Sequence, residues 1–173
     1  VAFRQNRPWY TKPSIVKDSV FKLGNASGTG GAMDVTAMQT TVHVSTTRFL
    51  DNYADQSGGA ISGSASAIIT VTDSVMANNA AGESGGSAYA SAASLIFDNV
   101  SVSESTAGLK GGGVALNGDT SIGRFSNSDF VKSNASLHGG ALAAWSDVAE
   151  LVIEGASFAQ CVVEEQGGAL HVD

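Results

Sequence analysis

Three histidines and one cysteine are the residues of this sequence best suited to bind a transition metal or to act as a nucleophile: His43, His138, His171 and Cys161. Zinc sites use closely spaced His and Cys pairs, and none of these four residues forms such a pair. The sequence also has no Asp-rich calcium loop and no phosphate-binding Gly-x-x-x-x-Gly-Lys motif. We therefore expect no metal and no cofactor. We interpret Cys161 as a small buried polar residue and His138 as a solvent-exposed one.

Three Asn-x-Ser sequons offer a second kind of chemistry. They begin at Asn25, Asn99 and Asn134. In a chain that passes through a eukaryotic secretory pathway, such asparagines accept N-linked glycans. Asn and Ser are also ordinary turn residues, so the sequence leaves both readings open.

The charges are distributed unevenly along the 173 residues. Residues 1–23 hold five basic residues and one acidic residue, whereas residues 24–173 hold four basic and fifteen acidic residues. A net charge of −7 argues against a nucleic-acid-binding protein. No apolar stretch is long enough for a transmembrane helix. The basic head suggests an interaction segment. Because the sequence begins at Val1 without a signal-peptide pattern, we expect a processed chain or a piece of a longer one.

The elements that must position these residues follow from an internal repeat. Gly-Gly pairs begin at six positions, spaced by 28, 27, 26, 28 and 28 residues: Gly30, Gly58, Gly85, Gly111, Gly139 and Gly167. A large apolar residue precedes each pair, by nine positions in five copies and by ten in the third: Phe21, Phe49, Val75, Val102, Phe130 and Phe158. Six phased copies predict a repeat architecture.

Two further series share the repeat. Three positions after the apolar residue stand small, mostly polar residues: Gly24, Asn52, Asn78, Ser105, Ser133 and Cys161. Five positions after it stand small apolar residues: Ala26, Ala54, Ala80, Ala107, Ala135 and Val163. We expect the large apolar residues to stack inward, the Asn and Ser residues to hydrogen-bond the turns, and the glycines to supply positive φ at a corner.

Each repeat also carries short apolar runs with strand periodicity, as in 42–44, 95–97 and 151–153. Ser, Thr and Gly interrupt every longer run, so no helical stripe forms. A unit of 26–28 residues with about three strands is typical of one turn of a parallel β-helix. The sequence therefore predicts an all-β, right-handed, single-stranded parallel β-helix of about six turns over residues 14–173. Residues 1–13 are predicted to form a non-repeat N-terminal arm.

The paired motif resembles a known repeat. Gly58-Gly59-Ala60-Ile61, with Phe49-Leu50-Asp51-Asn52 ahead of it, is similar to the repeats of the chlamydial polymorphic membrane proteins. The Gly-Gly-Ala part recurs from Gly30, Gly139 and Gly167, whereas Phe-x-x-Asn is intact once. The resemblance covers roughly residues 15–173. It implies a β-helical surface segment involved in adhesion, like related repeats of extracellular fibres, but the shared residues are structural ones.

Two other uses of a β-helix compete with this interpretation. A polysaccharide-processing, pectate-lyase-like enzyme needs converging carboxylates. Asp98 and Glu154 share a phase two turns apart, with Ser126 between them, and Glu104 and Lys132 form an opposite-charge pair on adjacent turns. An ice-binding domain needs a regular Thr face, and the threonines cluster in two turns only: Thr40, Thr41, Thr46, Thr47, Thr70 and Thr72.

We therefore expect a non-enzymatic, extracellular or cell-surface structural or adhesive segment that builds an appendage or filament through end-to-end contacts. The expected partners are copies of the chain or adjoining β-helix segments, with glycans or a host surface as further partners, and neither nucleic acid nor a transmembrane segment. The residues expected to carry assembly lie in the basic arm and in the acidic last turn: Phe3, Arg4, Arg7, Trp9, Tyr10, Glu164, Glu165 and Asp173.

Overall fold

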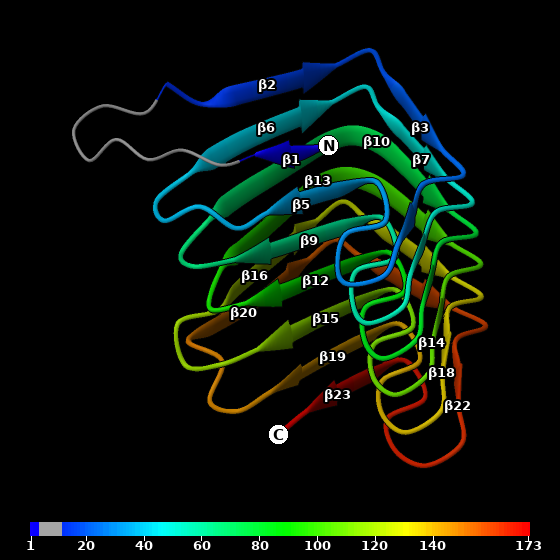
Figure 1. Ribbon diagram of the computed structural model, residues 1–173. Coiled ribbons are helices and arrows are strands. Elements are labelled where there is room, and N and C mark those ends of the chain that lie inside the picture. The colour runs from blue at the N-terminus through cyan, green and yellow to red at the C-terminus, as the bar shows by residue number, and fades with distance from the viewer. Residues whose placement is uncertain (4–11) are drawn as a thin grey trace.

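The computed structural model describes residues 1–3 and 12–173, and in these residues it contains strands and no helix. The strands form three parallel sheets that wind into a solenoid of about six turns (Figure 1). We call the turns coils 1 to 6; they span residues 14–40, 41–67, 68–93, 94–121, 122–149 and 150–173. The fold predicted from the repeat is confirmed.

Each sheet takes its strands from successive coils, in order. Sheet A contains β1 (Ala2–Phe3), β5 (Met33–Val35), β9 (Ile61–Ser64), β12 (Ala88–Ser91), β15 (Val114–Asn117), β19 (Leu142–Trp145) and β23 (Leu170–Val172). Sheet B contains β2 (Ser14–Lys17), β6 (Thr41–Ser45), β10 (Ile68–Ala77), β13 (Ser94–Ser103), β16 (Ile122–Ser126) and β20 (Glu150–Glu154). Its bent-over half adds β3 (Val20–Lys22), β7 (Arg48–Leu50), β17 (Asp129–Val131) and β21 (Ser157–Ala159). Sheet C contains β4 (Asn25–Ala26), β8 (Tyr53–Ala54), β11 (Ala80–Ala81), β14 (Thr106–Ala107), β18 (Asn134–Ala135) and β22 (Val162–Val163).

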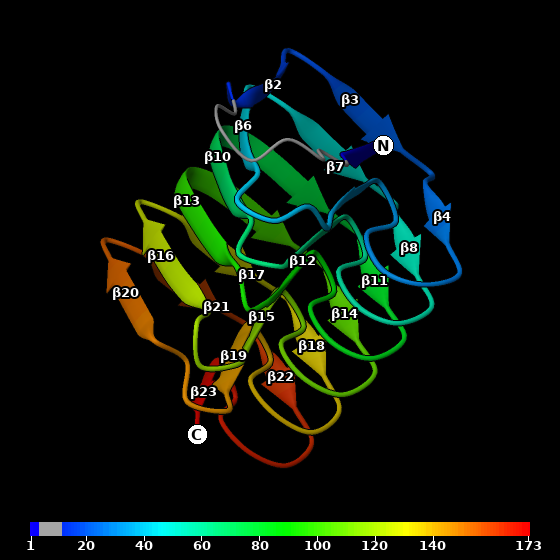
Figure 2. The ribbon, with the colours of Figure 1, turned by 60° about the vertical axis from the view of Figure 1, so that its left-hand side comes forward.

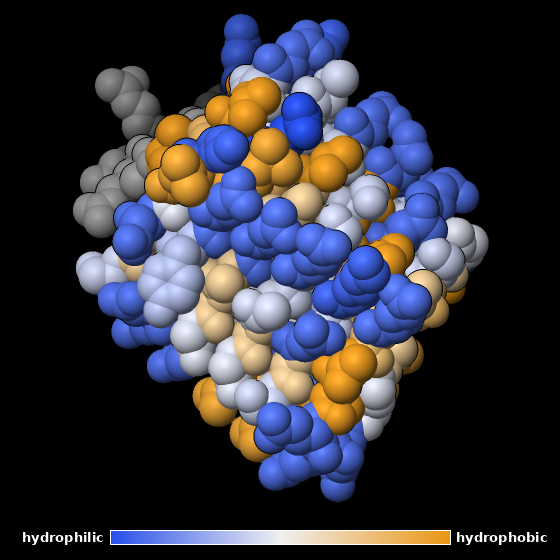
Figure 3. Space-filling view, turned by 90° about the vertical axis from the view of Figure 1, so that its right-hand side faces the viewer, coloured by the Kyte–Doolittle hydropathy of each residue, from blue (hydrophilic) through white to orange (hydrophobic). Residues whose placement is uncertain are grey.

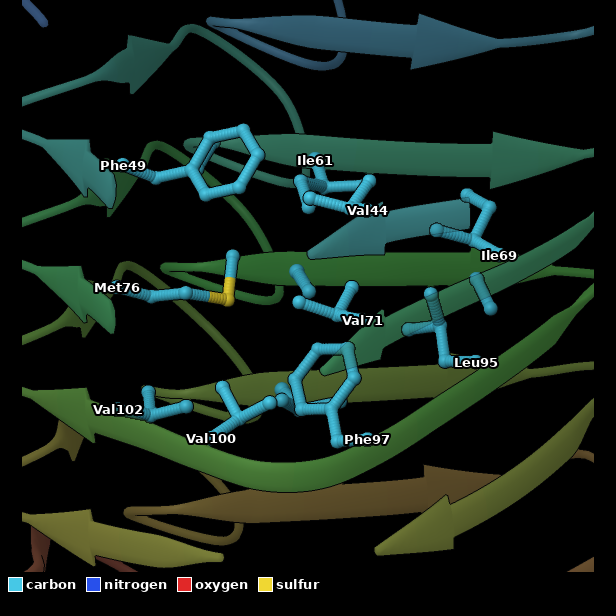
Figure 4. Close-up of a cluster of buried hydrophobic side chains, with 14 of the residues drawn as sticks. Val44, Phe49, Ile61, Ile69, Val71, Met76, Leu95, Phe97, Val100 and Val102 are labelled. Carbon is cyan, nitrogen blue, oxygen red and sulfur yellow. The ribbon is translucent and has the colours of Figure 1, made fainter. Parts of the chain in front are cut away.

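The large apolar residues stack inward as one column, with one correction to the predicted register. In coil 3 the residue that pairs with Phe49 and Val102 is Met76, not Val75. Met76 is fully buried, whereas Val75 is 36% exposed. With Met76 in the column, the apolar residue precedes Gly-Gly by nine positions in all six coils. The prediction was wrong because it preferred a β-branched residue to the adjacent methionine, which fills the core equally well. Figure 4 shows Met76 in the core close to Phe49.

The same one-residue shift corrects the two series that follow. The buried amide of coil 3 is Asn79, not Asn78, and the small residue that pairs with Ala54 and Ala107 is Ala81, not Ala80. The Asn79 amide Nδ2 donates to the carbonyl oxygen of Phe49 at 3.0 Å and to Ser87 Oγ at 3.3 Å. Its Oδ1 accepts from the backbone amide of Asn52 at 3.0 Å. The buried column therefore links neighbouring coils by side-chain hydrogen bonds, as predicted.

The Gly-Gly corner needs glycine for two different reasons. The first glycine of each pair has positive φ, for example +59° at Gly139, as predicted. The second glycine lies against the next coil: a Cβ on Gly140 would stand 2.3 Å from the carbonyl oxygen of Gly168. A contact this close forces the backbone to move, so both positions exclude larger residues in the stacked coils.

Two other corners reach positive φ mostly with residues other than glycine, which was not predicted from the sequence. One column holds Leu23, Asp51, Asn78, Glu104, Lys132 and Gln160, with φ between 51° and 58°. The other holds Asp18, Thr46, Asp73, Asn99, Asn127 and Gly155, with φ between 48° and 60°. Hydroxyl groups stabilise this second corner from inside, because Ser74 Oγ accepts from the Thr47 amide at 3.0 Å and Ser128 Oγ from the Val100 amide at 3.2 Å.

The segment predicted as a non-repeat arm begins with a short strand. Ala2–Phe3 forms β1, which pairs in parallel with β5, Ala2 opposite Asp34 and Phe3 opposite Val35. A short extended segment pairs readily with a free strand edge, which explains this placement. Residues 4–11 lie outside the described residues.

Candidate interaction surfaces

Asp98 and Glu154, the two carboxylates that a glycosidase would need, share the predicted column, but their contacts are those of structural residues. Asp98 pairs with Ser126, which pairs with Glu154, so the two acids lie two coils apart. Asp98 Oδ1 accepts hydrogen bonds from Asn127 Nδ2 and Ser126 Oγ, each at 2.9 Å. These bonds, that from Asn127 first, lower the pKa of Asp98 below its ordinary value. A general acid of a glycosidase needs the opposite shift.

Exposed ion pairs join neighbouring coils, and one of them places Lys22 Nζ 3.8 Å from Asp51 Oδ2. Lys132 Nζ lies 3.6 Å from Glu104 Oε1, which confirms the predicted pair. Arg124 forms a two-pronged contact with Glu150, at 3.2 Å and 2.8 Å. The hydrogen bond from Arg124 lowers the pKa of the Glu150 carboxyl, and the bond to Glu150 raises that of the Arg124 guanidinium. Such surface pairs contribute little to stability.

The His and Cys residues do not form a metal site. Within residues 1–3 and 12–173 no group of three or more His, Cys, Asp or Glu side chains is arranged to hold an ion. His138 was predicted to be solvent-exposed, but it is half-buried and stacks on His171 with ring centroids 4.4 Å apart. Cys161 continues the polar column but is half-buried, not buried as predicted, with Sγ 3.5 Å from the Phe130 carbonyl oxygen. This contact is consistent with a packing role for the thiol.

A cluster of long side chains on the outer face of sheet A was missed from the sequence. Tyr89 and Trp145 have ring centroids 6.5 Å apart, and Lys110 Nζ lies 4.6 Å from the centroid of the Trp145 ring. Outward-facing Ala115 and Ala143 at the centre of this face are fully buried. The cluster therefore covers small residues of the sheet. Sequence spacing gave no signal for it, because its members occupy different phases of the repeat.

The three sequon asparagines are all exposed. Asn25 and Asn134 begin strands of sheet C, at the same phase, and Asn99 lies at the bend of β13. Asn99 Nδ2 donates to Asp73 Oδ1 at 2.8 Å. A shallow groove of about 260 Å³ runs across this bend, lined by Asp73, Ser74, Val75, Asn99, Val100, Ser101, Asn127 and Asp129. Exposure is compatible with glycosylation, which stays a prediction.

The threonines do not form a regular face. Thr40 and Thr47 are buried, and Thr46 stands at a positive-φ corner. Only Thr41, Thr70 and Thr72 belong to the solvent side of sheet B in the strands β6 and β10. The geometry therefore offers no continuous array for ice binding.

The two ends of the solenoid are its most distinctive surfaces. Phe21 and Phe158, in the first and last coils, are only half-buried, whereas the phenylalanines of the same column between them are fully buried. Each stacks on its inner neighbour in the same way: the ring centroids of Phe21 and Phe49, and of Phe130 and Phe158, lie 5.1 Å apart. Large exposed apolar residues are concentrated in these coils, as in Ile15 (72%), Leu23 (71%) and Val162 (59%). Figure 3 shows orange patches towards both ends.

The predicted assembly residues are divided between the two ends. Arg4, Arg7, Trp9 and Tyr10 lie outside the described residues, and Phe3 belongs to β1. Glu164, Glu165 and Asp173 are exposed in coil 6. Six acidic residues lie in coil 6 or just before it: Asp147, Glu150, Glu154, Glu164, Glu165 and Asp173. No Lys or Arg follows Lys132 in the sequence.

Comparisons with known proteins give no further identification. No family model, no curated protein and no solved structure matches the chain. The arguments about function therefore rest on the sequence and on the geometry described above.

Proposed function

We propose that this chain is a non-enzymatic structural segment of an extracellular or cell-surface β-solenoid, which is extended end to end by further coils of the same kind. The observation that carries the proposal is the match between the two ends. Phe158 exposes one ring face at one end of a column, and Phe21 exposes the opposite ring face at the other end. A coil stacked in register on coil 6 would bring a Phe21 ring onto Phe158, repeating the stacking found inside the molecule.

The glycine column supports the same docking. In coils 1 to 5 a Cβ on the second glycine would stand 2.1–2.3 Å from a carbonyl oxygen of the next coil. Gly168, in coil 6, faces no such neighbour: the nearest atom to its Cβ position is the Cys161 carbonyl oxygen, at 3.9 Å. The fold of the described residues therefore does not require glycine at this position, whereas a following coil would require it.

Open strand edges supply the backbone part of the contact. Among the described residues, strands β20 to β23 of coil 6 pair with coil 5 alone, and β2 to β4 of coil 1 end sheets B and C at the other end (Figure 2). Unpaired N–H and C=O groups along a strand edge favour pairing with another strand. Because the two faces differ, the contact is head to tail and continues as an open filament. The surface location rests on the family resemblance and on the exposed sequons.

The experiment is a pair of glycine substitutions followed by light scattering over a range of protein concentrations. Gly168→Val should leave the single chain folded but reduce association at least about tenfold. Gly28→Val is the matched control, because nothing lies within 4 Å of its Cβ position and the other coils carry Gln56, Glu83, Leu109, Leu137 and Glu165 at this phase. Equal association of the two variants would contradict the proposal, and so would a parent chain that never associates.

A further inference from the structure

Sheet A has one strand more than its neighbours at the N-terminal end. Sheets B and C end at β2, β3 and β4 of coil 1, but sheet A continues beyond β5 to β1. Figure 1 shows β1 beside β5 at this end of the solenoid. The N-terminal face is therefore stepped: the first coil is open on two sheets and covered on the third.

The register shows which strand β1 replaces. Following the pairs along sheet A, Asp34 shares a column with Ala143, and Val35 with Ala144. Ala2 and Phe3 stand on Asp34 and Val35, and His171 and Val172 stand next to Ala143 and Ala144 at the other end. β1 thus occupies, within one chain, the site that β23 of a preceding copy would take in a stack in which all three sheets are continuous.

We infer that β1 is an exchangeable edge strand, which leaves β5 when β23 of a second copy of this chain docks there. The inference rests on the proposed end-to-end stacking. If β1 stayed in place, sheet A would contribute seven strands per copy, whereas sheets B and C would contribute six levels each. Sheets B and C of one copy would then be separated from the same sheets of the next copy by a gap of one coil, about 4.8 Å. Exchange removes this mismatch, because β23 makes the same parallel pairing.

Side chains at the resulting junction are complementary. In sheet B, Lys17 and Glu154 belong to the same column of paired residues, so Glu154 of one copy would stand beside Lys17 of the next. In sheet A, His171 would stand beside Asp34. The opposite charges of Glu154 and Lys17 stabilise pairing and suppress other registers. The partner that fits this surface is therefore a second copy docked in one register.

The experiment locks β1 in place. In a Cys161→Ser background, Ala2→Cys and Thr36→Cys are joined within one chain by a short bis-maleimide; Thr36 is exposed and lies two residues beyond Asp34, the residue that pairs with Ala2. The control is the same protein with each cysteine capped by a mono-maleimide. A variant lacking residues 1–3 removes the competing strand. Particle mass is followed by sedimentation at increasing concentration.

We expect the locked protein to remain a single chain while the capped control associates. The shortened variant should associate at about tenfold lower concentration, because no strand must leave. If locked and capped proteins associate alike, β1 does not exchange, although end-to-end stacking stands. If neither the capped control nor the shortened variant associates, the proposed stacking itself fails, and the inference with it.

Discussion

The inner coils and the end coils have the same sequence pattern but different surroundings. Phe49 and Phe130 are enclosed by a coil on each side, whereas Phe21 and Phe158 have a coil on one side only. Gly140 meets the backbone of the following coil, and Gly168 meets none. The repeat thus specifies contacts that the inner coils satisfy and that the end coils leave open.

The glycine column gives the largest expected difference. Gly140→Val places side-chain atoms where the Gly168 carbonyl oxygen lies, so we expect a loss of about 4 kcal/mol or more in the free energy of unfolding. Gly168→Val should cost about 1 kcal/mol or less at protein concentrations where the chain is single. Urea denaturation of both variants checks this, with Gly140→Ala as the milder substitute if Gly140→Val does not fold. Similar losses in the two variants would show that the ends are packed like the middle.

The phenylalanine column gives the next largest effect. Phe130→Ala removes a fully buried ring and should cost roughly 3–5 kcal/mol. Phe158→Ala removes a half-buried ring and should cost roughly 1–2 kcal/mol, because part of its surface is already in water. Denaturant melts at low concentration measure both. A loss below about 1 kcal/mol for Phe130→Ala would remove it from the core.

The buried polar column contains one side chain with hydrogen-bond partners, Asn79, and one without, Ser133. Asn79→Ala leaves the Phe49 carbonyl and the Asn52 amide without this partner, so we expect a loss of about 2–3 kcal/mol. Ser133 Oγ is buried and has no hydrogen-bond partner, so Ser133→Ala should be neutral or slightly stabilising. Thermal melts of the two variants test the contrast. Equal destabilisation would mean that Ser133 contributes bonds that the geometry does not show.

The exposed pair of Arg124 and Glu150 gives the smallest effect. Because the pKa of Glu150 is lowered in the folded chain, the pair contributes stability above the ordinary Glu pKa, and this contribution is lost as the pH falls through the folded value. In Arg124→Gln, an NMR titration should show the Glu150 pKa rising towards its ordinary value. An unchanged pKa would contradict the assigned cause.

The fold was predictable because its signal is repeated. Six Gly-Gly pairs at nearly constant spacing establish the coil length and the inward column, even with the error at Val75 and Met76. That error arose because Val75 and Met76 are adjacent apolar residues that fit the pattern about equally well, and the β-branched residue was preferred. The positive-φ corners at Leu23 or Lys132 were not predictable, because no residue type is shared along the column.

The surfaces were less predictable because they depend on which phases meet across a sheet. The Tyr89 and Trp145 cluster joins residues from different phases, and the His138 and His171 stack does the same. The pairing of Ala2–Phe3 with β5 had no repeat signal, since a two-residue strand is defined by the edge it meets. The position of β1 on sheet A therefore emerged only from the structure.

Imaging of particle length tests the central claim most directly. Six coils make a rod of roughly 29 Å, since parallel strands are about 4.8 Å apart. The account predicts that negatively stained parent chain forms unbranched rods several times this length as concentration rises, while Gly168→Val stays near one unit. Parent particles that remain one unit long at every concentration, or Gly168→Val rods as long as those of the parent, would contradict it.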